Sequence, residues 1–213
     1  MLTMKNIKLS IAAILTIFLG FSSCIEHEVI PAPVPEVDLF CEFSGSINST
    51  AVQLTQNVAG YYLKTSKAKI LLPPPSLSSA VYYSEILSAS SNASIKVSLG
   101  SLNWDASTLN EPSIAAFNDF HANALSPVYT TGAASGFEVT YRDGLGNVWV
   151  SQQGSPNPQV VLFSNIKQES DATGDYSKFQ CNFSCYVYRQ EPITLVWDSL
   201  PIQNAIFKGW FKR

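Results

Sequence analysis

Cys24 is the residue whose setting most strongly indicates a covalent reaction. Two small residues, Ser22-Ser23, come directly before it, an apolar run from Ile11 to Phe21 precedes them, and Lys5 and Lys8 precede the run. A helix that spans a bilayer needs roughly 20 apolar residues, and this run has 11. Positive charge, a short apolar run and small residues, in that order, are typical of a secretory signal that is removed after export.

The segment that ends at Cys24 resembles the lipobox of bacterial lipoproteins. The resemblance implies that residues 1–23 are a signal peptide and that Cys24 is acylated on sulfur and becomes the new amino terminus. Two or more acyl chains, at about 0.8 kcal/mol for each buried methylene, hold a protein firmly to a bilayer. Ile25 rather than aspartate follows, so we expect a lipid anchor in the outer membrane of the cell envelope. The alternative is an ordinary cleaved signal with an incidental cysteine.

The other three cysteines lie in runs with the period of a strand. In residues 179–187 the alternation puts Cys181 and Cys185 on one face about 13 Å apart, whereas a disulfide needs Cα atoms within about 7 Å. These two therefore cannot bridge each other. Cys41 lies in a second alternating run and could pair with Cys181 or Cys185 across a core. Three free thiols are an equal alternative, because free cysteine is among the most buried residue types.

No cluster of residues indicates a metal, a cofactor or a catalytic centre. His27 and His121 form no ligand group at zinc spacing, and the Asp143 loop offers one carboxylate where calcium needs six or more oxygens. His121 with Asp119 or Asp143 would need a marked serine, and no Gly-x-Ser-x-Gly motif occurs. An envelope hydrolase would need two carboxylates that act as partners. Nothing in the sequence marks any two of the four candidates as such a pair; the candidates are Glu42, Glu85, Asp105 and Glu138.

Two tyrosines indicate a binding surface. Tyr186 and Tyr188 alternate with Phe183 and Val187, so in a strand they lie on the opposite face from the apolar residues. Outward tyrosine rings combine apolar area with a hydroxyl, and they can form a platform for a glycan or for a partner protein. The alternative is a second packed face or scattered surface tyrosines.

Composition limits the class of partner. The chain has 13 Lys and Arg against 16 Asp and Glu, and a mildly acidic exported protein is a poor nucleic-acid binder. Only 14% of residues are charged and 46% are hydrophobic, with Ser, Thr and Asn abundant, which favours strands and turns over long surface helices. We therefore predict no nucleic-acid partner and a β-rich domain.

The elements that would position these residues fall in two parts. Residues 24–36 carry prolines at 31, 33 and 35 and should form an extended tether of about 3.1 Å per residue. Residues 37–213 show alternating runs separated by turn residues, and we predict an antiparallel β-sandwich. The predicted strands are 37–44, 50–55, 59–64, 68–72, 81–89, 93–102, 137–142, 147–152, 159–167, 178–188, 192–198 and 205–212.

One segment has a helical period. Asn110 can cap a helix whose apolar stripe continues to Leu125, and Pro127 then ends it. The resulting fold class is a mainly β domain with one short helix. The stripe predicts that His121 packs against the sheet instead of acting as a base.

Several stretches resemble uncharacterised β-rich lipoproteins of Bacteroidetes. The resemblance implies location and fold, and the family implies no known activity. We expect an outer-membrane lipoprotein that is a non-enzymatic binding module, with an envelope hydrolase or a structural surface protein as alternatives. The stretches that carry the resemblance are Phe43-Ser-Gly-Ser-Ile-Asn48, Phe117-Asn-Asp-Phe120, residues 136–149, residues 179–188 and Ile206-Phe-Lys-Gly-Trp-Phe211.

Overall fold

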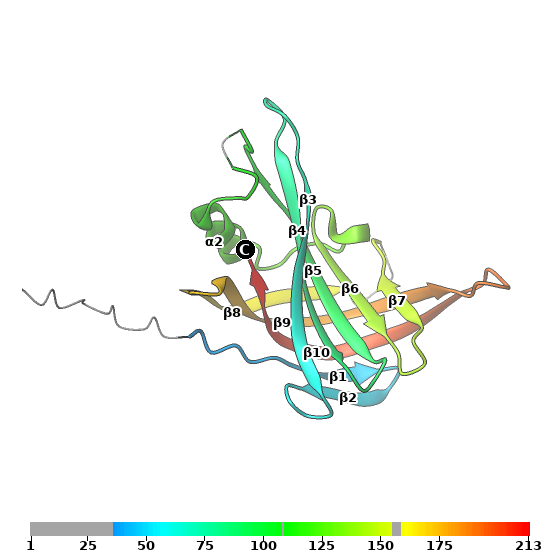
Figure 1. Ribbon diagram of the computed structural model, residues 1–213. Coiled ribbons are helices and arrows are strands. Elements are labelled where there is room, and N and C mark those ends of the chain that lie inside the picture. Colours follow the sequence, from blue (N-terminus) through cyan, green and yellow to red (C-terminus); the bar gives the residue numbers. More distant parts are fainter. Residues whose placement is uncertain (1–35, 108, 155–158) are drawn as a thin grey trace, which may run out of the picture. The chain divides into compact units, whose positions relative to one another are not determined.

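The computed structural model describes residues 36–107, 109–154 and 159–213 (Figure 1). The predicted signal peptide (1–23), Cys24, His27 and the tether up to residue 35 lie outside the described residues. Within the described part, no helix is long and apolar enough to cross a membrane.

In the described residues the strands form one antiparallel sheet accompanied by one α-helix, so the predicted mainly β fold with one short helix is confirmed. The strands are β1 (Glu42–Ile47), β2 (Thr50–Thr55), β3 (Tyr61–Ile70), β4 (Ser78–Ser88), β5 (Ser94–Trp104), β6 (Phe137–Arg142), β7 (Val148–Ser151), β8 (Val160–Asp171), β9 (Gly174–Gln190) and β10 (Trp197–Lys212). The helices are α2 (Ile114–Asn123) and the 3-10 turn η1 (Thr131–Ala133).

Strand β9 is the centre of the sheet. The order is β2-β1-β10-β9-β7-β6-β5-β4-β3, and β8 pairs with the part of β9 that β7 leaves free. β9 and β10 pair over almost their whole lengths, from Trp197 opposite Gln190 to Lys212 opposite Tyr176. This long ribbon fixes which side chains of the neighbouring strands stand side by side.

The core lies between two halves of the curled sheet. β10, in one half, contacts β3 and β4, which are at the far end of the strand order. Aromatic rings fill the space between, such as Phe179 and Phe211 with centroids 4.6 Å apart and Phe137 and Phe183 at 5.9 Å. Fully burying one such apolar side chain contributes about 1.5–3 kcal/mol, so this aromatic layer is the main stabilising element.

Gly209 lets β10 cross close to β3 and β4. A Cβ at this position would lie 2.6 Å from Cδ1 of Leu63 and 3.2 Å from Oγ of Ser84. Real Cβ atoms do not approach as closely as 2.6 Å, so a larger residue would displace the Leu63 side chain. The missing side chain at Gly209 therefore leaves room for Leu63 and Ser84 beside β10.

The helix begins later than the sequence predicted. Ser113, not Asn110, is the N-cap, and its Oγ accepts a hydrogen bond from the Ala116 N–H at 3.1 Å. Glu111 lies before the helix because Lys67 and Lys69 of β3 both donate to its carboxylate. Competition from these cations explains the shifted start.

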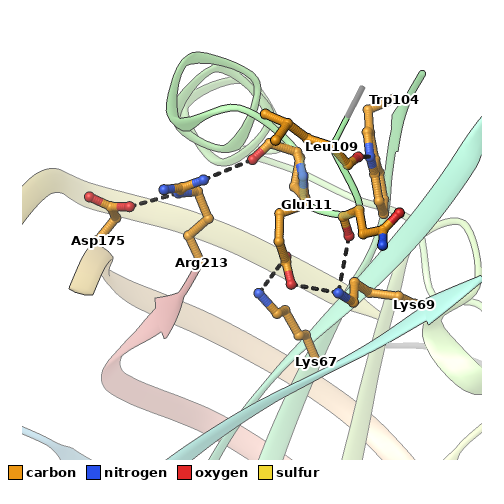
Figure 2. A network of polar contacts seen from close by, with 9 residues as sticks. Lys67, Lys69, Trp104, Leu109, Glu111, Asp175 and Arg213 are labelled. Atoms are coloured by element: carbon orange, nitrogen blue, oxygen red, sulfur yellow. Dashed lines mark hydrogen bonds and ion pairs between the residues drawn. The ribbon is translucent and has the colours of Figure 1, made fainter. Parts of the chain in front are cut away.

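Figure 2 shows the polar contacts that hold this pre-helical loop. Besides the two lysines on Glu111, the Trp104 indole N–H donates to the Leu109 carbonyl at 3.2 Å. Arg213, at the end of the chain, donates to the Pro112 carbonyl at 3.0 Å and forms an ion pair with Asp175 at 2.6 Å. Exposed ion pairs each contribute little, about 0–1 kcal/mol, but together these contacts join β3, the loop, the chain end and the β8–β9 turn.

His121 is a core residue, as its position in the apolar stripe predicted. Its ring stacks on Phe211 with centroids 4.9 Å apart and an interplanar angle of 12°, and Phe117 packs against its other side at 4.4 Å. Burial lowers the pKa of His121 to about 3; the Phe117 carbonyl favours the protonated ring only weakly. Neither ring nitrogen makes a hydrogen bond within the described residues. A neutral, buried imidazole of this kind cannot serve as an exposed catalytic base.

The buried histidine makes stability acid-sensitive. Below about pH 6.5 the unfolded chain binds a proton at residue 121, but the native state stays neutral down to about pH 3. The free energy of unfolding should therefore fall with decreasing pH in this window, by up to about 1.4 kcal/mol per pH unit from this group. Urea unfolding at several pH values checks this, with His121→Phe as the variant: its pH dependence should be shallower, and an unchanged slope would contradict the assignment.

Candidate functional site

The richest surface for binding is the outward side of β8, β9 and β10, which we call the outer face. Along β9 the odd-numbered residues from Phe179 to Val187 are buried and the even-numbered ones are partly exposed. The outward column runs for about 34 Å, at about 3.4 Å per residue. It consists of Lys178, Gln180, Asn182, Ser184, Tyr186 and Tyr188.

A polar groove of about 340 Å³ occupies one end of this face. Three lysines from three adjacent strands line it: Lys167 of β8, Lys178 of β9 and Lys208 of β10. Asp38 and Phe40 complete the wall from the segment before β1, and the Phe40 side chain is 49% exposed. The groove therefore combines hydrogen-bond donors, an acid and an aromatic ring.

Each lysine of the polar groove is paired with a carboxylate. Glu169 receives Lys178 at 2.8 Å and Lys167 at 3.0 Å, and Lys208 lies 3.0 Å from Glu42. The hydrogen bonds from the two lysines lower the pKa of Glu169. Three lysines share two glutamates, and Asp38 in the wall is a third acid, so the groove has no excess of basic over acidic side chains.

A bulge in β8 shapes the rim of the polar groove. The pairing of β8 with β9 shifts between Ser164 and Lys167, and Asn165 adopts a left-handed backbone with φ 53°. Asparagine tolerates this conformation better than most residues. The bulge bends the strand, and Asn165 lines the groove.

A second, apolar groove continues along the same face. It has a volume of about 350 Å³ and is lined by Val160 and Leu162 of β8 and Ile206 of β10, with Asn182 between them. The Gln180 amide, at the edge of the polar groove, donates to Oδ1 of Asn182 at 3.1 Å. The two grooves therefore meet at this pair of amides.

Tyr186 and Tyr188 lie farther along the outer face, as the alternation predicted. Both are partly exposed; Tyr186 stands opposite Pro201 of β10, and Tyr188 stands between Ser199 of β10 and Val150 of β7. The tyrosines extend the face beyond the apolar groove. They do not line either groove.

The sequence reasoning missed the groove residues. Phe40 carried a signal, since it falls among the polar positions of the alternating run 37–44. Lys167, Lys178 and Lys208 come from three strands, and only the register of β8, β9 and β10 brings them together. Alternation within one strand cannot supply that register.

The carboxylates considered for a hydrolase are separated. Glu42 pairs with Lys208, Glu85 accepts from the Ser94 hydroxyl at 2.9 Å, and Asp105 accepts from the Ser107 N–H at 2.8 Å. Glu138 accepts from the Gly132 N–H and holds η1 against the sheet, and burial raises its pKa. Within the described part, no two of these four carboxylates are bonded to each other or to a shared partner.

The Asp143 loop is a hairpin turn that satisfies its own carboxylate. Oδ1 accepts from the N–H groups of Leu145 and Asn147, both at 2.9 Å, and Oδ2 accepts from the side chains of Asn147 and Trp149. No oxygen is left to favour calcium. Among residues 36–107, 109–154 and 159–213 there is also no group of three potential metal-ligating side chains.

The three cysteines take the second of the two alternatives left open by the sequence. All three are free, buried thiols. Cys41 directly precedes β1, the other two are on β9, and β10 lies between these strands in the same sheet. Strands that flank a third are about 10 Å apart, beyond the reach of about 7 Å of a disulfide.

Comparison of the chain with protein-family models, with curated proteins and with solved structures found no match. The resemblance to Bacteroidetes lipoproteins therefore stays a prediction.

The buried cysteines should be unreactive in the native protein. Burial raises the pKa of Cys41 to about 11 and that of Cys185 to about 12, and it raises the pKa of Cys181 as well. We expect no rapid labelling of these thiols by a maleimide at neutral pH in the folded chain, and labelling of all three after unfolding without a reductant. Mass spectrometry counts the labels. Only one reactive thiol among the three after unfolding would show that a bridge exists.

Proposed function

We propose that this protein is an outer-membrane lipoprotein, attached through an acylated Cys24, whose domain binds a glycan without chemical turnover. The observation that carries the proposal is the row of outward side chains on β9 that connects two grooves and two tyrosines. An extended face of this length suits a chain-like ligand better than a small molecule.

The chemistry of the polar groove favours a saccharide. Asp38 and the amide groups of Asn165 and Gln180 line it, and such planar polar groups bond sugar hydroxyls as donors and acceptors. The Phe40 ring supplies an apolar surface beside them, which suits the apolar face of a sugar ring. Because every lysine is already paired with a carboxylate, a strongly charged ligand would have to break ion pairs.

A non-enzymatic role fits the state of the acids near the grooves. Glycoside hydrolysis needs one protonated and one ionised carboxyl group at a set separation. Glu42 is paired with Lys208, and the hydrogen bonds from two lysines lower the pKa of Glu169. Glu169 can therefore orient a ligand but is a poor proton donor at neutral pH.

An envelope protein is the second candidate ligand, and a specific observation favours it. Val160 and Leu162 of β8 are exposed in the apolar groove, and Tyr186 lies on the neighbouring strand β9, two residues beyond the partner of Val160, Ser184. Apolar side chains and tyrosines are enriched in protein interfaces. A partner protein would therefore contact the apolar groove first, whereas a glycan would contact the polar groove.

Substitutions in the two grooves should separate these ligands. Phe40→Ala and Gln180→Ala should each weaken glycan binding about tenfold, since a stacked ring or a lost hydrogen bond contributes about 1–1.5 kcal/mol. Leu162→Ala, in the apolar groove, should weaken glycan binding less than either of these, and Leu145→Ala, in the distant β6–β7 turn, is the matched exposed control that should leave it unchanged. A glycan array followed by calorimetry with the detergent-solubilised mature protein measures the effect. Binding to a partner protein that only Leu162→Ala weakens would favour the second candidate, and sugar release would indicate a hydrolase.

The anchor has its own test. Cys24→Ala should abolish metabolic labelling with an alkynyl fatty acid and release the protein from the membrane fraction, because the acyl chains are lost. Cys41→Ala is the control variant and should keep both properties. Labelling that persists in Cys24→Ala would show that the anchor lies elsewhere.

A further inference from the structure

The β3–β4 hairpin ends in an exposed apolar segment, residues 70–77, which we call the apolar tip. Ile70 is 62% exposed, and Leu71, Leu72 and Leu77 are exposed as well. Leu109, in the loop after β5, is 62% exposed, and Lys69 donates to the carbonyl of the next residue, Asn110, at 3.1 Å. Soluble surfaces rarely gather this many large apolar side chains without a partner.

The apolar tip has a fixed shape. The Ser78 hydroxyl accepts from the Leu72 N–H at 2.9 Å, and the Ser76 N–H donates to the Pro73 carbonyl at 3.1 Å. Figure 1 shows the hairpin extending past the neighbouring strands at the top of the view. The leucines are therefore presented to the surroundings by an ordered turn and not by a free loop.

The tip carries no charge. From Ile70 to Ser84 the sequence contains no acidic or basic residue. The other exposed apolar turn, around Ile193 between β9 and β10, differs because the Glu191 carboxylate lies within it and accepts from the Ile193 N–H at 2.7 Å. Insertion of a charged group into lipid is costly, so of these two turns the uncharged tip of β3–β4 is the better suited to a bilayer.

The base of the hairpin, at Lys67 and Lys69, is connected by contacts to the place where the N-terminal segment enters the domain. The Val37 N–H donates to Asp171 in the β8–β9 turn at 2.9 Å, and Asp175, four residues later, pairs with Arg213. Arg213 bonds the Pro112 carbonyl, and the adjacent Glu111 binds the lysines at the base of the hairpin (Figure 2). One row of contacts thus connects the chain entry to the hairpin.

We infer that the apolar tip inserts into the lipid surface of the membrane that holds the Cys24 anchor. The inference rests on the proposed anchor, since the 13 residues from Cys24 to Glu36 span at most about 43 Å and so limit the distance between the entry end and the bilayer. A protein partner fits less well, because a stable interface buries about 800 Å² on each side and the tip offers only a few side chains. Lipid needs no complementary surface.

A polarity-sensitive fluorophore at the tip tests the inference. Ser76→Cys places an exposed thiol there, and the three buried native cysteines do not compete for the label. The mature lipoprotein is labelled with a nitrobenzoxadiazole dye and reconstituted into vesicles of phosphatidylethanolamine and phosphatidylglycerol. We expect a blue-shifted emission and shielding from iodide. The same dye on Asp198→Cys, an exposed position at the start of β10, should remain quenchable.

Variants of the tip separate docking from anchoring. Leu71→Ser with Leu72→Ser should lower the shielded fraction of the dye at position 76 about tenfold or more, because two apolar side chains lose their lipid contacts. Ile193→Ser with Leu195→Ser, two even more exposed residues at the other turn, should not change it. Circular dichroism confirms that both variants fold. If the protein stays with the vesicles while the dye at position 76 remains in water, the insertion of the tip is overturned and the anchor stands. If the protein does not associate with vesicles at all, the anchor is overturned.

Discussion

The pairing of β9 with β10 is the constraint on which the rest of the structure depends. Because side chains of a strand alternate, the register that buries Phe179 and Phe183 against the core also turns Gln180 and Asn182 outward. A slip of one residue would exchange the two sets and bury a lysine. The aromatic core and the outer face are therefore two consequences of a single register, and the core stabilises the face without touching a ligand.

Alternation and turn chemistry were enough to predict the fold class, most strands and the outward side of Tyr186 and Tyr188, because these depend on neighbours along the chain. What failed depended on distant contacts. The predicted strands 59–64 and 68–72 are one strand, β3, because β4 pairs with it without a break. The helix begins later than predicted, because Lys67 and Lys69 bind Glu111 outside α2. The polar groove could not be predicted, because it is assembled from β8, β9, β10 and the entering segment.

Several polar groups in the core make no hydrogen bond with the described residues. The Tyr82 hydroxyl, the Ser84 hydroxyl and both nitrogens of His121 are buried without a hydrogen-bond partner among the described residues. Each such group costs about 1–3 kcal/mol. Tyr82 and His121 pack edge to face with centroids 5.0 Å apart, and Ser84 faces the gap left by Gly209. Ring packing and close strand crossing therefore determine these positions more than hydrogen bonding does.

The entering segment belongs to the candidate site and leads to the proposed attachment. Asp38 and Phe40 form a wall of the polar groove, and Val37, directly before them, is fixed to Asp171 in the β8–β9 turn. A force that pulls on the N-terminal segment would act first on the hydrogen bond between Val37 and Asp171, and then on Asp38 and Phe40 in the groove wall. A chain that began after Phe40 would keep the β9–β10 core but lose the aromatic ring of the groove, so ligand binding and folding have different N-terminal limits. This difference follows from geometry, because the segment lines the groove before it joins the sheet at Glu42.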